Sequence, residues 1–125
     1  MLLLGDFLYR SNLEVNCCRQ VIDAYKECGC TLVSITEVLL NQVVQYYATF
    51  GQYVLTPEVF KELERQIRGS GKPSEGKEYG LTAALDTVRE KYGMYAFLPD
   101  GESFDIGLSD AYRETMRRFG RPDNE

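Results

Sequence analysis

Short apolar runs alternate along this chain with segments that have helical periodicity. Residues 1–4 are apolar and predict a short buried strand. The S-x-x-E spacing from Ser11 to Glu14 is that of a capping box, which predicts a helix that begins there and ends at Gly29. Residues 31–38 are rich in β-branched side chains, so a second strand is expected. A strand, a helix and a strand in this order form a βαβ unit with a right-handed crossover, and the predicted fold class is therefore α/β.

The middle of the chain contains a helix with clear start and stop signals. An N-cap, a first-turn proline and a first-turn carboxylate follow one another at residues 56–58, and Gly69 ends the helix. Four apolar residues are predicted to line its buried face: Val59, Phe60, Leu63 and Ile67. Residues 52–55 predict a short strand before this helix. Residues 39–50 suit either a helix or a strand, and the spacing of their apolar side chains favours a helix.

The last third of the chain predicts two helices and a hairpin. Residues 81–92 form an amphipathic pattern that Gly93 ends. Residues 94–98 and 103–106 are expected to pair as a hairpin across a Pro-Asp-Gly turn. Ser109 is predicted to cap a final helix with one apolar face and one basic face. The inward residues of this helix are Tyr112, Met116 and Phe119, and the outward residues are Arg113, Arg117 and Arg118.

Composition and charge restrict the function classes. The 125 residues fit one domain, 1–125, and a hydrophobic content of 44% is that of an ordinary globular chain. The net charge of −5 opposes phosphate neutralisation, so nucleic acid is not an expected partner. No apolar stretch approaches the roughly 20 residues of a membrane span, so no membrane partner is expected and a cytoplasmic location is predicted. The absence of histidine excludes His-dependent triads, dyads and zinc sites.

Two motifs suggest ligand sites but lack the spacing that these sites need. The four cysteines form one adjacent pair and one C-x-C pair, not the C-x2-C pairs of a zinc site, and Cys17 lies on an apolar helical stripe. We therefore predict that they are small buried hydrophobes. Residues 69–80 predict a mobile loop that contains G-x4-G-K. Glu78 stands where a P-loop needs Ser or Thr, and a helix precedes the loop where a strand is needed, so no P-loop is predicted.

Two aspartates lie where an α/β fold tends to place chemistry. Asp6 follows the first predicted strand, and Asp105 lies at a strand-to-helix junction beside Gly107. Two such carboxylates, with water and substrate phosphates, would suffice to hold Mg²⁺. An aspartate at a strand end also commonly caps a turn, so this structural role stays open for both residues. The arginines of the last helix could bind phosphate, but a solvated helix face is the favoured interpretation.

Three parts of the chain, taken in order, resemble the sugar-1-phosphate nucleotidylyltransferases, and most closely their uridylyltransferase branch. Residues 2–9 (LLLGDFLY) are similar to the central strand of the family, which ends in Gly-Asp. Residues 51–63 (GQYVLTPEVFKEL) are similar to its G-x-Y-V-L-T-P-E segment. Residues 79–88 and 103–115 are similar to its L-T-x-A and F-D-x-G-x-x-x-x-Y segments. The resemblance therefore covers most of the chain.

The resemblance implies a partial Rossmann-like nucleotide-diphospho-sugar transferase sheet and a metal-dependent reaction. In the family, a sugar 1-phosphate attacks the α-phosphorus of a nucleoside triphosphate and pyrophosphate leaves, which gives a nucleotide sugar such as UDP-glucose. Asp6 matches the Gly-Asp aspartate and Asp105 matches the aspartate of F-D-x-G, so the resemblance implies that both hold Mg²⁺. Gly51 matches a glycine at which the backbone passes close to the sugar. The implied ligand is a nucleotide sugar or a sugar 1-phosphate.

Parts of the family pattern are not matched. The chain has no counterpart of the Gly-rich nucleotide loop, and residues 39–50 are too short to hold the family's sugar-phosphate segment. We therefore expect a C-terminal, internally shortened portion of such an enzyme, inactive by itself. The alternative is a non-catalytic α/β interaction or oligomerisation module, whose exposed sheet edge pairs with another copy or another chain. Low stability of the isolated chain is a third alternative.

Overall fold

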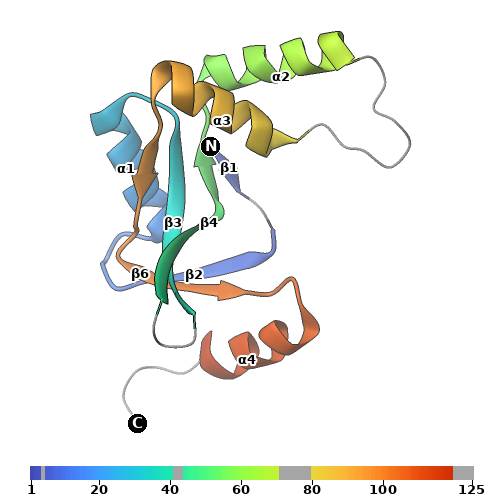
Figure 1. Ribbon diagram of the computed structural model, residues 1–125. Coiled ribbons are helices and arrows are strands. Elements are labelled where there is room, and N and C mark those ends of the chain that lie inside the picture. Colours follow the sequence, from blue (N-terminus) through green and yellow to red (C-terminus); the bar gives the residue numbers. More distant parts are fainter. Residues whose placement is uncertain (4, 41–43, 71–79, 120–125) are drawn as a thin grey trace.

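The computed structural model describes residues 1–3, 5–40, 44–70 and 80–119 (Figure 1). In these residues the chain forms β1 (Leu2–Leu3), β2 (Phe7–Ser11), α1 (Cys17–Cys28), β3 (Leu32–Leu40), β4 (Val44–Val54), α2 (Pro57–Ser70), α3 (Leu81–Tyr92), β5 (Tyr95–Phe97), β6 (Gly101–Asp105) and α4 (Ser109–Phe119). The α/β fold class is confirmed.

The strands form one mixed sheet and one small antiparallel sheet. The main sheet has the order β1-β4-β3-β5, in which β4 is antiparallel to both β1 and β3, and β5 is parallel to β3. β1 and β3 are therefore parallel, but β4 lies between them, so the predicted βαβ unit does not join adjacent strands. The small sheet pairs β2 with β6.

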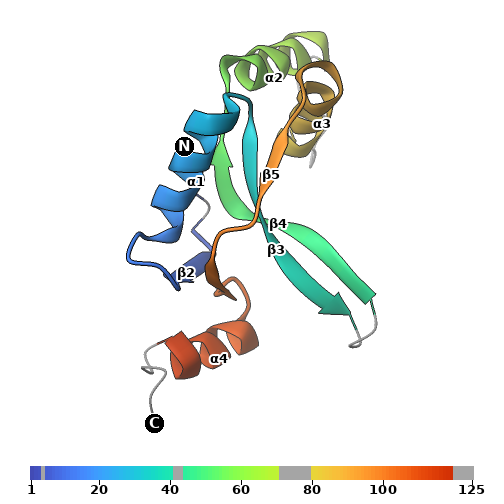
Figure 2. The ribbon, with the colours of Figure 1, turned by 90° about the vertical axis from the view of Figure 1, so that its left-hand side faces the viewer.

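Helices cover both faces of the main sheet. Neighbouring residues of a strand point to opposite faces, so Leu32 packs with Val21 of α1, while Val33 packs with Val59 of α2 and Val88 of α3. All five side chains are buried. Figure 2 shows α1 on one side of β3 and β4, and α3 on the other. Two apolar clusters thus share the same strands.

The predicted helix in residues 39–50 is wrong. β3 continues to Leu40, and β4 begins at Val44 and pairs with β3 from Leu40 back to Leu32. The apolar spacing in this region fits both a helix and a strand. The region forms a strand because β3 provides a backbone partner for it. Figure 2 shows the two strands extending together beyond the helices that cover the rest of the sheet.

The predicted start of the first helix is also wrong. Ser11 ends strand β2, and its hydroxyl accepts from the Leu13 amide (3.0 Å) and donates to the Val15 carbonyl (2.6 Å), which closes a local turn. The N-cap of α1 is Asn16, whose side chain accepts from the Arg19 amide at 2.8 Å. The predicted end is confirmed, because Gly29 caps α1 in the left-handed conformation.

Strand β1 exists, but the prediction that it is buried is wrong. Leu2 and Leu3 are 37% and 54% exposed, because β1 is an edge strand that contacts only β4 within the sheet. An apolar run by itself does not distinguish a central strand from an edge strand.

The predicted C-terminal hairpin is wrong, although both of its strands exist. β5 pairs with β3, and β6 pairs with β2 from Ser11↔Gly101 to Phe7↔Asp105. β2 was not predicted as a strand, so the true partner of β6 was not recognised. Figure 1 shows β2 and β6 side by side across the lower part of β3 and β4, with α4 below them.

The helices α2 and α3 are confirmed, but α2 continues through Gly69, its predicted end, to Ser70, and the buried faces of two helices differ from the prediction. In α2, Val59 is buried while Phe60 and Ile67 are 59% and 49% exposed. In α4, Thr115 is the buried residue, and the predicted inward residues Tyr112, Met116 and Phe119 are exposed. Each helix contacts a narrow partner, so only part of its apolar face is covered.

The predicted mobile loop lies mainly outside the described residues. Gly69 belongs to α2, Gly80 is the N-cap of α3, and the G-x4-G-K motif falls between them, where the structure describes nothing. In the described ranges, no helix is both long enough and apolar enough to cross a membrane.

Candidate functional site

The small sheet brings the two predicted metal residues together. Asp6 directly precedes β2, and Asp105 is the last residue of β6. The register places Phe7 opposite Asp105, and the Ile106 amide donates to the Asp6 carbonyl at 2.8 Å. Two residues that lie 99 positions apart in the sequence are therefore neighbours at one end of the small sheet.

Gly107 lies close to both aspartates. A Cβ at this position would lie 3.3 Å from Asp105 Oδ1 and 3.4 Å from Asp6 Cβ. The Gly107 amide donates to Asp105 Oδ1 at 2.8 Å, which orients the Asp105 side chain. This leaves little room for a side chain at residue 107, so a glycine allows the turn after β6 to pass close to both aspartates.

Helix α4 holds the backbone of this site. The Thr115 hydroxyl donates to the Asp105 carbonyl at 2.9 Å, and Thr115 is buried. The turn after Asp105 leads into α4, where the Tyr112 amide donates to the Leu108 carbonyl at 2.8 Å. The position of Asp105 thus depends on the docking of α4 as well as on the β2–β6 pairing.

The donor set fits Mg²⁺ as a partial site. Mg²⁺ is commonly bound by one or two carboxylates, with waters and substrate phosphates as the remaining ligands. Asp6 and Asp105 supply two carboxylates, and Asp6 is exposed to solvent. The described residues contain no cluster of three or more carboxylate or cysteine groups that could form a complete protein cage.

Gly51, the predicted sugar-binding residue, lies under the aromatic side chains of β2. Its φ is +63°, and a Cβ there would lie 2.5 Å from Phe7 Cδ2 and 3.1 Å from the Tyr9 hydroxyl. Gly51 is buried. The structure therefore brings Gly51 against Phe7, the residue after Asp6, and the close approach at this glycine is made by the chain's own aromatic ring.

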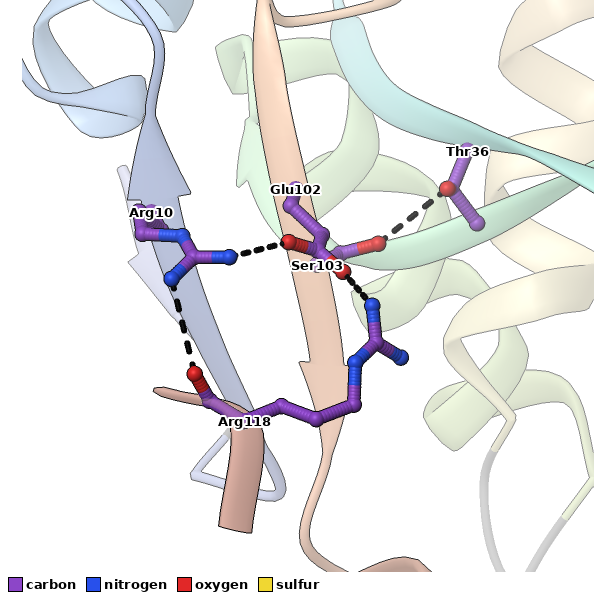
Figure 3. Close-up of polar contacts among 5 residues, drawn as sticks. All are labelled: Arg10, Thr36, Glu102, Ser103 and Arg118. Atoms are coloured by element: carbon purple, nitrogen blue, oxygen red, sulfur yellow. Dashed lines mark hydrogen bonds and ion pairs between the residues drawn. The ribbon is translucent and has the colours of Figure 1, made fainter. Parts of the chain in front are cut away.

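A charged cluster lies on the face of the small sheet opposite to Phe7 and Tyr9, and it was not recognised in the sequence. Glu102 of β6 pairs with Arg10 of β2 at 2.6 Å and with Arg118 of α4 (Figure 3). Both guanidinium groups lie over the Phe104 ring, at 5.4 and 5.5 Å from its centroid. Arg118 is exposed, as predicted, and it also fixes the end of α4 to the small sheet. No local signal indicates this pairing, because its members come from three separate segments.

The cysteines do not form a metal site in the described part of the chain. All four thiols are free. Cys17 is buried, as predicted for a small hydrophobe, but the predicted burial is wrong for the other three, which are only half-buried: Cys18, Cys28 and Cys30. Burial is the main cause that raises the pKa of the Cys17 thiol, and the neighbouring Cys18 adds to it. A thiol held protonated in this way is a poor nucleophile.

Sequence comparison relates the chain to known enzymes. No protein-family model matches it. It is 26% identical to a UTP–glucose-1-phosphate uridylyltransferase of Staphylococcus epidermidis over 98% of the chain, and 25% identical to that of Staphylococcus haemolyticus over 97%. A shorter match, to UTP–glucose-1-phosphate uridylyltransferase 1 of Streptococcus pyogenes, has 37% identity over 68 residues, 54% of the chain and 21% of that protein. The chain is homologous to the bacterial UTP–glucose-1-phosphate uridylyltransferases.

The homology covers only part of these uridylyltransferases. The chain spans about half the length of the curated relatives it matches, 51% for the Staphylococcus epidermidis protein. That alignment runs over 153 positions, more than the 125 residues of the chain, so the uridylyltransferase carries residues inside the aligned region that this chain lacks. This agrees with the internal shortening that the sequence predicts.

Solved structures support the same fold. UDP-glucose pyrophosphorylase complexed with UDP-glucose matches with a TM-score of 0.75 and 23% identity, over 94% of this chain and 54% of that one. The UTP-bound enzyme from Acinetobacter baumannii matches with a TM-score of 0.74 and 19% identity, over 97% of this chain and 51% of that one. At these identities the match shows a shared fold. Each solved enzyme is about twice as long as the part that this chain matches.

Proposed function

We propose that this chain is a metal- and sugar-binding portion of a uridylyltransferase-like protein that holds Mg²⁺ with Asp6 and Asp105. The observation that supports the proposal is that Asp6 and Asp105 are neighbours at one end of the small sheet and both lie close to Gly107. The ligand that we propose is a nucleotide sugar such as UDP-glucose, or a sugar 1-phosphate, because the homologous enzymes are uridylyltransferases of glucose 1-phosphate.

In this proposal each residue has a limited chemical task. A bound Mg²⁺ would neutralise phosphate oxygens of the ligand. Asp6 and Asp105 would hold the metal, and the Gly107 amide keeps Asp105 in one orientation through its hydrogen bond. The turn at residue 107 and the docked helix α4 would preorganise the two carboxylates, so that they need not reorganise when the ligand arrives.

The metal site can be tested with Mn²⁺ as a paramagnetic probe of the ¹⁵N-labelled chain. We expect Mn²⁺ to broaden the amide signals of Asp6, Asp105 and Gly107 before others, and UDP-glucose to strengthen this effect. Asp6→Asn and Asp105→Asn should each abolish it, because the amide keeps the shape but removes the charge. Asp110→Asn, an exposed aspartate in the first turn of α4, is the matched control. Equal broadening in all variants would contradict the proposal.

Turnover by this chain alone is not expected, because the homology covers about half of the enzymes. UTP and glucose 1-phosphate with Mg²⁺ should release no pyrophosphate above background. Clear release that depends on both Asp6 and Asp105 would show that this chain is a complete enzyme and would overturn this part of the proposal.

A second candidate function is self-association through the sheet edge. It is favoured by β1, an edge strand with exposed leucines at both positions. Sedimentation velocity over a hundredfold range of concentration should then show a concentration-dependent mass that Leu3→Lys abolishes. Leu13→Lys, at a leucine of similar exposure outside the sheet, should not change it. A strict monomer at all concentrations would exclude this candidate.

A further inference from the structure

An open cleft lies beside β6, on residues other than Asp6 and Asp105. It has a volume of about 560 Å³ and lies between β3, the segment that joins β5 to β6, and the first residues of β6. A narrow inner cavity of about 20 Å³ continues from it towards Tyr9 and Cys17. The inner cavity has room for one water molecule, whereas the open cleft falls in the range of small-molecule sites.

One wall of the cleft is fixed by hydrogen bonds between the Gln20 side chain and the backbone of Asp100. The Asp100 amide donates to Gln20 Oε1 at 2.7 Å, and Gln20 Nε2 donates to the Asp100 carbonyl at 3.0 Å. Gln20 is buried, so these hydrogen bonds are shielded from water. Gly101 follows, where a Cβ would lie 2.5 Å from the Arg10 carbonyl oxygen. The turn is therefore held in one conformation before any ligand binds, which lowers the entropy cost of binding.

The polar side chains that line the cleft carry two hydroxyls, one amide and two carboxylates, and of the carboxylates Glu102 is already paired with arginines. The Thr36 and Ser103 hydroxyls lie 3.1 Å apart across the gap between β3 and β6, as Figure 3 shows. Asn12 Nδ2 donates to Asp100 Oδ1 at 2.9 Å, and Asn12 and Asp100 are both exposed. A carboxylate has about four acceptor positions, so Asp100 can accept further hydrogen bonds.

The charges around the cleft disfavour an anionic ligand. Glu102 lines the cleft, and its carboxylate is paired with both Arg10 and Arg118, neither of which is among the lining residues. None of the described lining residues is a lysine or arginine. A phosphate in the cleft would therefore face the Asp100 carboxylate, and no described lining residue would supply it with a cation, which is an unfavourable arrangement.

We propose that this cleft binds a neutral polyhydroxyl molecule, such as a free monosaccharide or a small polyol. Hydroxyl groups of the ligand would donate to Asp100 and exchange hydrogen bonds with Thr36 and Ser103. Leu98 and Pro99 supply an apolar wall for its carbon skeleton. The proposal goes beyond the proposed metal site, and it uses neither Asp6 nor Asp105.

The proposal can be tested by titrating the ¹⁵N-labelled full chain with glucose, glycerol and glucose 1-phosphate. We expect glucose to shift the amide signals of Asn12, Asp100, Gly101 and Ser103 in a saturable way, and glucose 1-phosphate to bind more weakly at the same amides. Thr36→Val keeps the shape and removes one hydroxyl, so it should weaken glucose binding roughly five- to tenfold. Asp100→Asn, which removes the charge at an exposed side chain, should weaken it at least as much.

Thr82→Val, at an exposed threonine of α3, is the matched control and should leave the affinity unchanged. The dispersion of each variant's spectrum shows whether it is folded. The proposal is overturned if neither glucose nor glycerol gives saturable shifts, if folded Thr36→Val and Asp100→Asn bind as the wild type does, or if glucose 1-phosphate binds these amides more tightly than glucose. Signals of Asp6 and Gly107 report separately on the proposed metal site, so failure at one site is distinguishable from failure at the other.

Discussion

Gly51 combines a left-handed backbone with a close aromatic contact. Its φ of +63° is a conformation that side chains disfavour, and Phe7 occupies the place of a Cβ. Gly29 has a similar φ of +65° but no heavy atom within 4 Å of that place. The two glycines therefore separate a conformational requirement from a steric one.

We expect Gly51→Ala to lower the free energy of unfolding by about 2–4 kcal/mol, and Gly29→Ala by about 1–2 kcal/mol. In a Phe7→Ala background, Gly51→Ala should cost clearly less, close to the cost of Gly29→Ala, because the conformational part remains and only the Tyr9 hydroxyl still lies near the Cβ position. Urea denaturation of the four variants gives these values. Equal costs of Gly51→Ala with and without Phe7 would show that the ring does not limit this position.

The raised pKa of Tyr9 leads us to expect that stability depends on pH in the alkaline range. Burial is the main cause that raises the pKa of Tyr9, and the nearby Cys18 and Cys17 thiols add to it. The folded state keeps the phenol proton at a pH where the unfolded chain releases it, so this stabilisation is full below about pH 10 and is lost as the pH rises further. Tyr9→Phe should therefore lose less stability than the wild type between about pH 9.5 and 11. The matched control is Tyr47→Phe, at an exposed tyrosine, and it should follow the wild-type curve.

At the scale of elements, the start of α1 shows how two capping signals compete. Both Ser11 and Asn16 are good N-cap residues, but strand β2 includes Ser11, so the helix begins at Cys17 with Asn16 as its cap. Asn16→Ala should lower the free energy of unfolding by about 1 kcal/mol. Glu14→Ala, which would break the predicted capping box, should change it by less than about 0.5 kcal/mol. Thermal denaturation of both variants tests this, and a larger loss in Glu14→Ala would contradict the assignment of the cap.

The position of helix α4 depends on its contacts with the small sheet. Helix α4 is held by the Thr115 hydroxyl on Asp105, by the Phe119 ring 5.3 Å from that of Phe104, and by Arg118 on Glu102. Its apolar stripe suggests a broader contact, but the two-stranded sheet beneath it is too narrow to cover the stripe. The extent of burial on a helix therefore depends on the partner as well as on the pattern.

At the scale of the whole molecule, the two apolar clusters are coupled because they share strands. Leu32 and Val33 are neighbours on β3 and belong to opposite clusters, as do Tyr53 and Val54 on β4. Loss of packing on one face should therefore destabilise the strands that the other face needs. The chain should unfold in one cooperative transition.

This coupling can be tested with one substitution in each cluster. Val21→Ala, on the buried face of α1, and Val88→Ala, on the buried face of α3, should each lower the free energy of unfolding by about 2 kcal/mol. Each should lower a single transition that circular dichroism and tyrosine fluorescence both report. Exposed Val15→Ala is the control and should change little. Two separate transitions, with only one moved by each variant, would show that the clusters unfold independently.

The sequence predicts the parts of this protein whose signals are local. Gly29 and Gly93 end the helices at the expected positions, and α2 follows its cap, proline and carboxylate. Helix signals are local because each hydrogen bond joins residues four apart and each cap acts within one turn. The likeness to uridylyltransferases also singled out Asp6 and Asp105, because their motifs are short and contiguous, and the metal role of these aspartates stays a prediction.

Only the tertiary structure decided which strands pair and which apolar residues are covered. Residues 44–54 form a strand because β3 provides a partner, and β6 leaves the predicted hairpin because β2 provides a better-placed one. Strand pairing joins residues that are far apart in the chain, so no short window of sequence contains both partners. For the same reason, the approach of Asp6 to Asp105, the ring over Gly51 and the cleft beside β6 became visible only once the strands had been paired.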